Sequence, residues 1–212
     1  MMGKCTIGMS PIKNGRYVLN DEINGGLIIE NWFPISIGYV FNPNHREIES
    51  SLVSRCLDIK EVVSSGGDGW SSDVYNTEGK HDVWTDEKFD ELNKWIMLQV
   101  NSYKDSSITS PETNFELSQI EGWMNIYQNG DYQEYHNHIG SFISCIYFLK
   151  ADENASYVRF KAPYYDTHNV SDNISFYKPD PGKLLIFRSY IPHSVCKHTD
   201  DNLRISVAYN FS

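Results

Sequence analysis

Residues 203–211 read Leu-Arg-Ile-Ser-Val-Ala-Tyr-Asn-Phe, and this stretch decides the class of fold. Large apolar side chains alternate with smaller or polar ones along its length, which is the period of a β-strand with one apolar face. The opposite face carries Arg204 and Ser206. If that face lines the interior of a barrel, Arg204 is a buried charge that needs an anionic partner. A guanidinium pairs with a carboxylate through two hydrogen bonds, and a serine hydroxyl can add another.

Short strands of this kind fill the second half of the sequence. Turn signals separate them, for example Asn-Gly-Asp at 129–131 and Pro-Asp-Pro-Gly at 179–182. Many short strands at close spacing indicate a sandwich or barrel. The strands that we expect span residues 114–128, 132–138, 142–150, 156–162, 174–178, 183–189 and 203–211.

Two amphipathic helices are expected before these strands. Asn44 is the candidate N-cap of the first helix and Thr85 that of the second. Residues 27–41, upstream of both, indicate one or two strands broken near Pro34. Because the helices precede the strands, we expect a mainly β protein with flanking helices outside a β-core. The apolar stripe of the second helix consists of Phe89, Leu92, Ile96, Val100 and Tyr103.

Length and composition favour one folded domain. The chain has 212 residues, of which 40% are hydrophobic, and a formal net charge of −10, which argues against general nucleic-acid binding. We expect a single domain over 1–212, with N-terminal strands and supporting helices over 1–110 and the β-core over 111–212. No apolar run approaches a membrane span, and the first ten residues lack a signal-peptide pattern, so we expect a cytoplasmic protein. The cysteines lack metal or disulfide spacing and are expected to be free thiols: Cys5, Cys56, Cys145 and Cys196.

A cluster of histidines stands out in residues 127–138, which read Tyr-Gln-Asn-Gly-Asp-Tyr-Gln-Glu-Tyr-His-Asn-His. In an extended strand, Glu134, His136 and His138 share one face. Two imidazoles two residues apart can reach one metal ion, and imidazole suits Fe, Zn, Cu and Ni. His193, which follows an apolar strand, is the best candidate for a third ligand. No role is assigned to the remaining histidines, which have no partner pattern: His45, His81, His168 and His198.

Together these residues resemble the 2-oxoglutarate/Fe(II) oxygenase superfamily, including its prolyl-4-hydroxylase-like branch. Tyr127, Gly130 and His136 stand at the spacing of that branch, and His193 precedes Arg204 by eleven residues, as the distal histidine precedes the cosubstrate arginine. The match covers about residues 120–211. It is most similar to an uncharacterised set from bacteriophages and marine bacteria that carries His-x-His. The resemblance implies a double-stranded β-helix, or jelly roll, in a bacterial or phage-infected cytoplasm.

The resemblance also implies an activity, a set of ligands and a set of partners. Fe(II) and 2-oxoglutarate are the implied cofactor and cosubstrate, and molecular oxygen is the second cosubstrate. The implied reaction is hydroxylation of a small-molecule or peptidyl substrate, with no membrane partner and with oligomerisation left open. A loop over 151–173 is expected to cover the barrel mouth and select the substrate. The implied metal ligands are His136, His138 and His193, and the implied 2-oxoglutarate-binding residues are Tyr127, Arg204 and Ser206.

One position departs from the family pattern. Members usually carry His-x-Asp or His-x-Glu, whereas this chain has His138 at the second ligand position. Either three histidines hold the metal, or a carboxylate such as Glu134 or Asp131 completes the site. Two other classes of protein remain as alternatives. One is a cupin-like metal-binding protein that does not use 2-oxoglutarate, and the other is a catalytically inactive jelly-roll structural or interaction module.

Overall fold

The computed structural model of the chain describes residues 35–66, 69–107, 116–164 and 173–212. The larger sheet contains, in spatial order, β1 (Ile37–Phe41), β8 (Lys183–Arg188), β5 (Ile143–Lys150), β10 (Arg204–Phe211), β3 (Ile120–Tyr127) and β2 (Tyr75–Asn76). The smaller sheet contains β4 (Gln133–His136), β9 (His193–Val195), β6 (Val158–Lys161) and β7 (Ile174–Tyr177). The helices are α1 (His45–Val62) and α2 (Asp90–Ser107), with short 3-10 helices η1 (Val83–Thr85) and η2 (Glu87–Phe89) before α2.

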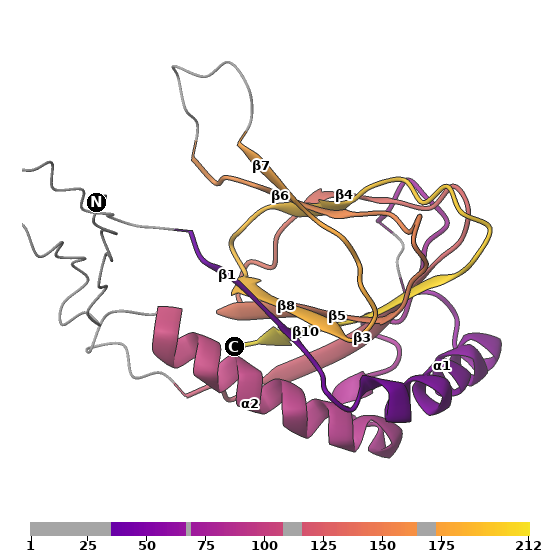
Figure 1. Cartoon of the computed structure of the whole chain (residues 1–212), viewed down its shortest axis with the longest axis horizontal. Coiled ribbons are helices and arrows are strands. Elements are labelled where there is room, and N and C mark those ends of the chain that lie inside the picture. Colours follow the sequence, from indigo (N-terminus) through magenta and orange to yellow (C-terminus); the bar gives the residue numbers. More distant parts are fainter. Residues whose placement is uncertain (1–34, 67–68, 108–115, 165–172) are drawn as a thin grey trace, which may run out of the picture.

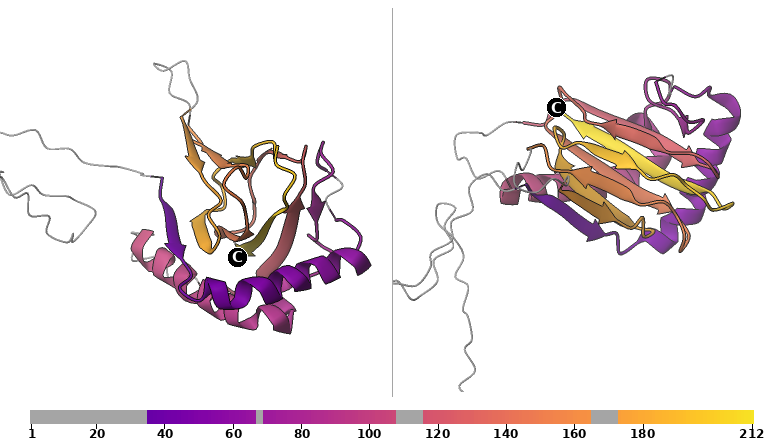
Figure 2. Two further views of the ribbon diagram at one scale, coloured as in Figure 1. Left: turned by 45° about the vertical axis from the view of Figure 1, so that its right-hand side comes forward. Right: turned by 90° about the horizontal axis from the view of Figure 1, so that it is seen from above.

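The two sheets face each other, and both helices lie on the outer side of the larger sheet (Figures 1 and 2). Every strand pair recorded in the two sheets is antiparallel. This arrangement confirms the predicted class, which is a mainly β double-stranded β-helix with flanking helices.

Strand β10 divides the interior into two regions, as its alternation predicted. Ile205, Val207, Tyr209 and Phe211 pack against the helices in one core cluster. The buried stripe of α2 joins the same cluster, so the helices cover the outer face of the larger sheet. The other face of β10 points toward the smaller sheet.

A second core cluster lies between the sheets and sets their separation. Phe148 and Phe187 from the larger sheet pack with Phe160 and Val195 from the smaller one. The rings of Phe160 and Phe187 meet edge to face, with centroids 4.8 Å apart. Both rings also approach His193, so the packing of this cluster fixes the position of that imidazole.

The helix starts differ from expectation. α1 begins directly after Asn44, but the Asn44 side chain makes no capping bond, and Asn42 Oδ1 accepts a hydrogen bond from the Asn44 amide instead. α2 begins only at Asp90, because η1 and η2 precede it. Asp86 accepts from the Lys88 amide at the start of η2, so an aspartate next to Thr85 performs the capping predicted for the threonine.

Several predicted strands are shorter than expected, and some predictions lie outside the described residues. β3 begins at Ile120, and β4 ends at His136. Residues 27–34, Cys5 and His168 lie outside the described part of the chain. Free thiols are confirmed for the described cysteines: Cys56 and Cys145 are buried, and Cys196 is half-buried. None of the described helices has the length and apolar character needed to cross a bilayer.

Candidate metal centre

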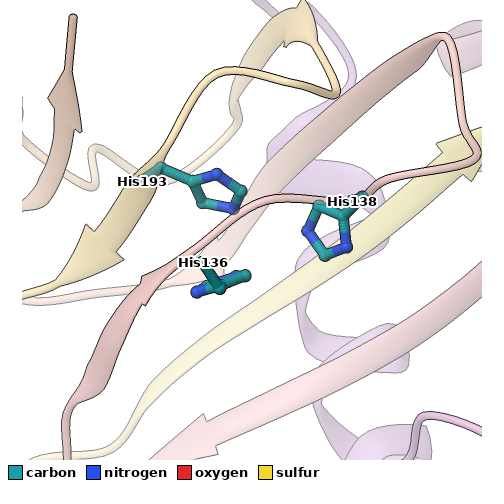
Figure 3. A group of neighbouring side chains, drawn as sticks. All are labelled: His136, His138 and His193. Carbon is teal, nitrogen blue, oxygen red and sulfur yellow. The ribbon is translucent and has the colours of Figure 1, made fainter. Parts of the chain in front are cut away.

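Three imidazoles gather between the two sheets (Figure 3). His136 ends β4 and pairs directly with His193, the first residue of β9, while His138 follows two residues after β4. The centroids of the His136 and His193 rings are 4.2 Å apart, and each lies 5.2 Å from the His138 ring. One nitrogen from each ring can be chosen so that all three lie within 4.8 Å of one another. Nitrogens bound to one ion at about 2.1 Å are at most about 4.2 Å apart, so a small closure of the rings suffices to bind a metal.

In two of these rings, a backbone carbonyl determines which nitrogen carries the proton and which keeps its lone pair. His136 Nδ1 lies 2.8 Å from the carbonyl oxygen of Glu134, and His193 Nδ1 lies 3.1 Å from that of Ile191. A carbonyl oxygen only accepts hydrogen bonds, so Nδ1 carries the proton in both rings. Nε2 then keeps its lone pair for a metal, and the carbonyl holds the ring orientation.

Burial keeps the three imidazoles in the neutral form that binds metals. Loss of solvent lowers the pKa of His136, and it lowers the pKa of His138 to about 4, where His136 adds to the effect. The pKa of His193 falls well below its ordinary value, mainly through burial and further through the two neighbouring imidazoles. Metal binding at neutral pH therefore needs no proton to be displaced from these rings.

His138 reaches the cluster by a different route from the one that strand alternation suggested. The register of β4 and β9 shifts between Gln133 and His136, and β4 has ended before His138. The His138 amide donates to the carbonyl oxygen of Ser189, at 2.9 Å, which ties this residue to the turn after β8. Trp123 flanks the ring, with a centroid separation of 5.5 Å.

Neither candidate carboxylate joins the cluster. Glu134 Oε1 accepts a hydrogen bond from the Ser71 amide, at 3.2 Å. Asp131 Oδ2 accepts from the Gln128 amide, at 2.7 Å, and closes the turn before β4. Within the described residues, the group of potential ligands consists of three histidines and contains no carboxylate.

Arg204 lies in the same pocket, fully buried. None of its three guanidinium nitrogens makes a hydrogen bond of good geometry to the described residues. The guanidinium carbon lies 4.3 Å from the centroid of the Tyr127 ring and 5.5 Å from that of Phe148. Burial lowers the pKa of Arg204, and the neighbouring Tyr127 opposes that shift. A buried cation without an anionic partner fits the carboxylate of a ligand.

Two further predicted residues stand beside Arg204. Tyr127 is its direct partner in the β3–β10 register, and its hydroxyl donates to Gln133 Oε1. Ser206 lies two residues further along the same face of β10 and lines the pocket. The pocket has an empty volume of about 460 Å³, including open solvent at its mouth, and joins the imidazoles to Arg204.

Sequence reasoning missed several side chains of the pocket wall. Trp70 packs edge-on against His136, with centroids 4.8 Å apart. The Asn125 side-chain oxygen accepts a hydrogen bond from the Asn76 side-chain nitrogen at 2.8 Å, in a network that extends to Gln133. Trp123 and Asn125 alternate along β3 with the predicted Tyr127, so the period of that strand could have identified these two residues once its pocket face was known.

The histidines that were assigned no role make local contacts. His45 Nδ1 lies 2.8 Å from the Tyr147 hydroxyl, and His81 Nε2 lies 2.9 Å from Asp86 Oδ2. His198 Nε2 lies 2.7 Å from the carbonyl oxygen of Asn202. Of the loop expected at 151–173, residues 165–172 are not described, and none of the described ones lines the pocket.

Comparison with known proteins finds a family similarity over the second half of the chain. Residues 121–210 match the family model described as "Putative 2OG-Fe(II) oxygenase", where 2OG stands for 2-oxoglutarate. No curated protein sequence matches the chain significantly. The matched segment contains the three histidines, Tyr127, Arg204 and Ser206.

Solved structures share the fold at low sequence identity. A prolyl-4-hydroxylase from Pseudomonas putida is 14% identical, with a TM-score of 0.59, over 84% of this chain and 92% of that one. A prolyl hydroxylase from Trichoplax adhaerens, in complex with a hypoxia-inducible factor peptide, is 15% identical, with a TM-score of 0.60, over 82% of each chain. The epimerase SnoN of nogalamycin biosynthesis is 12% identical, with a TM-score of 0.58, over 82% of this chain and 78% of that one.

The family match agrees with the predicted resemblance. The histidine cluster agrees with the prediction of a metal site. The cofactors typical of the family are Fe(II) and 2-oxoglutarate, and its enzymes act on their substrates with molecular oxygen. A buried, unpaired guanidinium in the pocket of three neutral imidazoles fits that pair of ligands. Over residues 121–210, which contain all of the candidate ligands, the chain is therefore similar to the 2OG-Fe(II) oxygenase family.

Proposed function

We propose that this protein hydroxylates a substrate with Fe(II), 2-oxoglutarate and molecular oxygen, and that six residues hold the cofactors. The observation that carries the proposal is the fully buried guanidinium of Arg204, which shares its pocket with three neutral imidazoles. The proposed iron ligands are His136, His138 and His193, and the proposed 2-oxoglutarate-binding residues are Tyr127, Arg204 and Ser206.

Each of these residues has a role that its surroundings support. Arg204 offers its guanidinium to the far carboxylate of 2-oxoglutarate, and Ser206 adds a hydroxyl on the same strand face. Tyr127 packs under the guanidinium and keeps water from it. The iron and 2-oxoglutarate, when bound, supply the oxidant for a C–H bond of the substrate.

The charge of the site also favours a dianionic ligand. The three imidazoles are neutral, so they leave the charge of a divalent metal uncompensated. Arg204 adds a positive charge at the other end of the pocket. A dianion that spans the two positions is therefore favoured at both of its ends.

The test is an anaerobic titration of Fe(II)-loaded protein with 2-oxoglutarate, followed by visible absorption. We expect a weak charge-transfer band in the wild-type protein and no band in Arg204→Met. Iron content is measured on the same samples. Iron without a band would contradict the oxygenase assignment and favour a cupin-like metal protein. A protein that binds no iron would instead favour an inactive jelly-roll module.

A further inference from the structure

The pocket is lined by two side chains of opposite charge. Among the residues that line it, Arg204 and Glu78 carry the full charges. Arg204 is buried beside Tyr127, at the last residue of β3. Glu78 is exposed and follows β2, whose register pairs Asn76 with Asn125 in the middle of β3. A ligand that reaches from the metal site to the rim therefore meets a carboxylate there.

The backbone beneath Glu78 is held by a series of hydrogen bonds. The Glu78 amide donates to Asn76 Oδ1 at 2.6 Å, and Asn76 Nδ2 donates to Asn125 Oδ1 at 2.8 Å. The Thr77 amide donates to the carbonyl oxygen of Met124 at 3.1 Å. The carboxylate is thus presented from a segment that is fixed to the sheet, which lowers the entropy cost of using it to bind a ligand.

The Glu78 carboxylate has no counter-ion in the described part of the chain. The hydrogen bond recorded for Glu78 among the described residues is that of its backbone amide, and the charge recorded near its carboxylate is that of Glu121. Although Glu78 is exposed as a residue, partial loss of water around its carboxyl raises its pKa, and the nearby Glu121 carboxylate raises it further. Glu121 stands two residues before Trp123 on β3, so the side chains of Glu121 and Trp123 point to the same face of the sheet. A cation between the two carboxylates would relieve their repulsion.

Two indole rings contact the metal centre and line the same pocket as Glu78. Trp123 lies 5.5 Å from the His138 ring, and Trp70 lies 4.8 Å from the His136 ring, measured between centroids. Both tryptophans and Glu78 line the pocket. Indole is the aromatic side chain that binds cations best, and its face also accepts the aliphatic chain that carries an ammonium or guanidinium group.

We propose that the substrate carries a positively charged nitrogen group, an ammonium or a guanidinium, which binds Glu78 and Glu121 beside Trp123. The proposal rests on the proposed function, because it assigns the metal and Arg204 to the two cofactors and the rim to the substrate. The carbon chain of such a substrate passes over the indole of Trp123 toward His138.

The experiment measures binding rather than turnover. The full-length protein is loaded with Zn(II), which does not support the oxidation, and with 2-oxoglutarate. Three probes of similar shape are titrated by calorimetry: N-acetyl-lysine amide, N-acetyl-arginine amide and the uncharged N-acetyl-norleucine amide. We expect one of the two cations to bind at least about tenfold more tightly than the norleucine probe, the size of one charge-assisted hydrogen bond.

Matched variants assign this preference to the rim. Glu78→Gln should reduce the preference for the cationic probe over the norleucine probe by about tenfold, and Glu121→Gln should reduce it by less. Glu91→Gln, an exposed change on α2 at the outer side of the larger sheet, should leave it unchanged. The affinity for 2-oxoglutarate should be the same in all three variants.

Three results would overturn the proposal while the proposed function stands. They are equal binding of the norleucine probe and both cations, a preference that survives in Glu78→Gln, and no binding of any probe to protein that has bound 2-oxoglutarate. Failure of 2-oxoglutarate itself to bind would refute the proposed function, and the substrate proposal with it.

Discussion

Replacement of Arg204 by methionine should change stability and ligand binding in opposite directions. A buried ion costs several kcal/mol of lost hydration, and the guanidinium of Arg204 recovers none of this through hydrogen bonds of good geometry to the described residues. Its contacts with the rings of Tyr127 and Phe148 return roughly 0.5–2 kcal/mol each. Methionine fills a similar volume without charge, so we expect the ligand-free variant to be more stable by about 1–3 kcal/mol.

The ligand response should be lost in the same variant. At a 2-oxoglutarate concentration about 100 times its Kd, binding stabilises the wild-type protein by about 2.7 kcal/mol, and Arg204→Met should gain almost nothing. Thermal unfolding of metal-free samples measures the first effect. Thermal unfolding of Zn(II)-loaded samples with and without 2-oxoglutarate measures the second. One kcal/mol corresponds to about 2–4 °C for a chain of this size.

Arg159→Met is the matched control for this prediction. Arg159 lies over the Tyr135 ring at 5.2 Å and donates to Ser194 Oγ, and it does not line the pocket. This variant should keep the full response to 2-oxoglutarate. The reasoning fails if ligand-free Arg204→Met is less stable than the wild-type protein, or if 2-oxoglutarate still stabilises it.

Three further outcomes are expected. His138→Ala should weaken metal binding by more than about a hundredfold in chelator competition. Removal of a residue that only supports a ligand already lowers metal affinity roughly 10–100-fold, so a decrease below tenfold would exclude His138 as a ligand. Burial alone would raise the pKa of Asp86, but hydrogen bonds from Arg55, the Lys88 amide and His81 outweigh this effect and lower the pKa. The ionised Asp86 carboxylate therefore contributes stability above the unfolded pKa, and this contribution disappears as the pH falls through the lower folded pKa. Asp86→Asn should therefore cost about 1.5–3 kcal/mol in urea unfolding at pH 7 and progressively less as the pH is lowered through the acidic range, and a cost that does not change with pH would refute this. Burial raises the pKa of Cys56 to about 12, so a thiol reagent should modify it only after unfolding, and rapid labelling of the native protein would contradict its burial.

The fold could be predicted from the sequence because its strands have one-sided patterns. The alternation in 203–211 separated the helix-facing side of β10 from the side that carries Arg204 and Ser206, and both sides lie where the pattern put them. The apolar stripe of the second helix was equally readable, since its five residues are all buried, Phe89 in η2 and the other four in α2. Predictions from such patterns agree with the structure because burial of an apolar face is the largest favourable contribution to the stability of these elements.

The site was only partly readable, because it depends on contacts between distant segments. Strand alternation brought His138 into the prediction, yet its position follows from a register shift and from a hydrogen bond to the Ser189 carbonyl. The roles of Trp70 and Glu78 could not be predicted either. Their place in the pocket comes from the pairing of β2 with β3 and from hydrogen bonds to β4, which no local pattern of sequence encodes.

The order of the proposed ligands along the chain would give a bound metal a role in stability as well as in chemistry. All four strands of the smaller sheet come from the segment between Gln133 and Val195, and His136 and His193 stand close to its two ends. An ion bound by these two residues would close that segment into a loop in the folded state, and preferential binding to this state would stabilise it against unfolding. The edge strand β4 is recorded in only two register pairs with β9, so a metal bound by His136 and His193 would add a further link between these two strands.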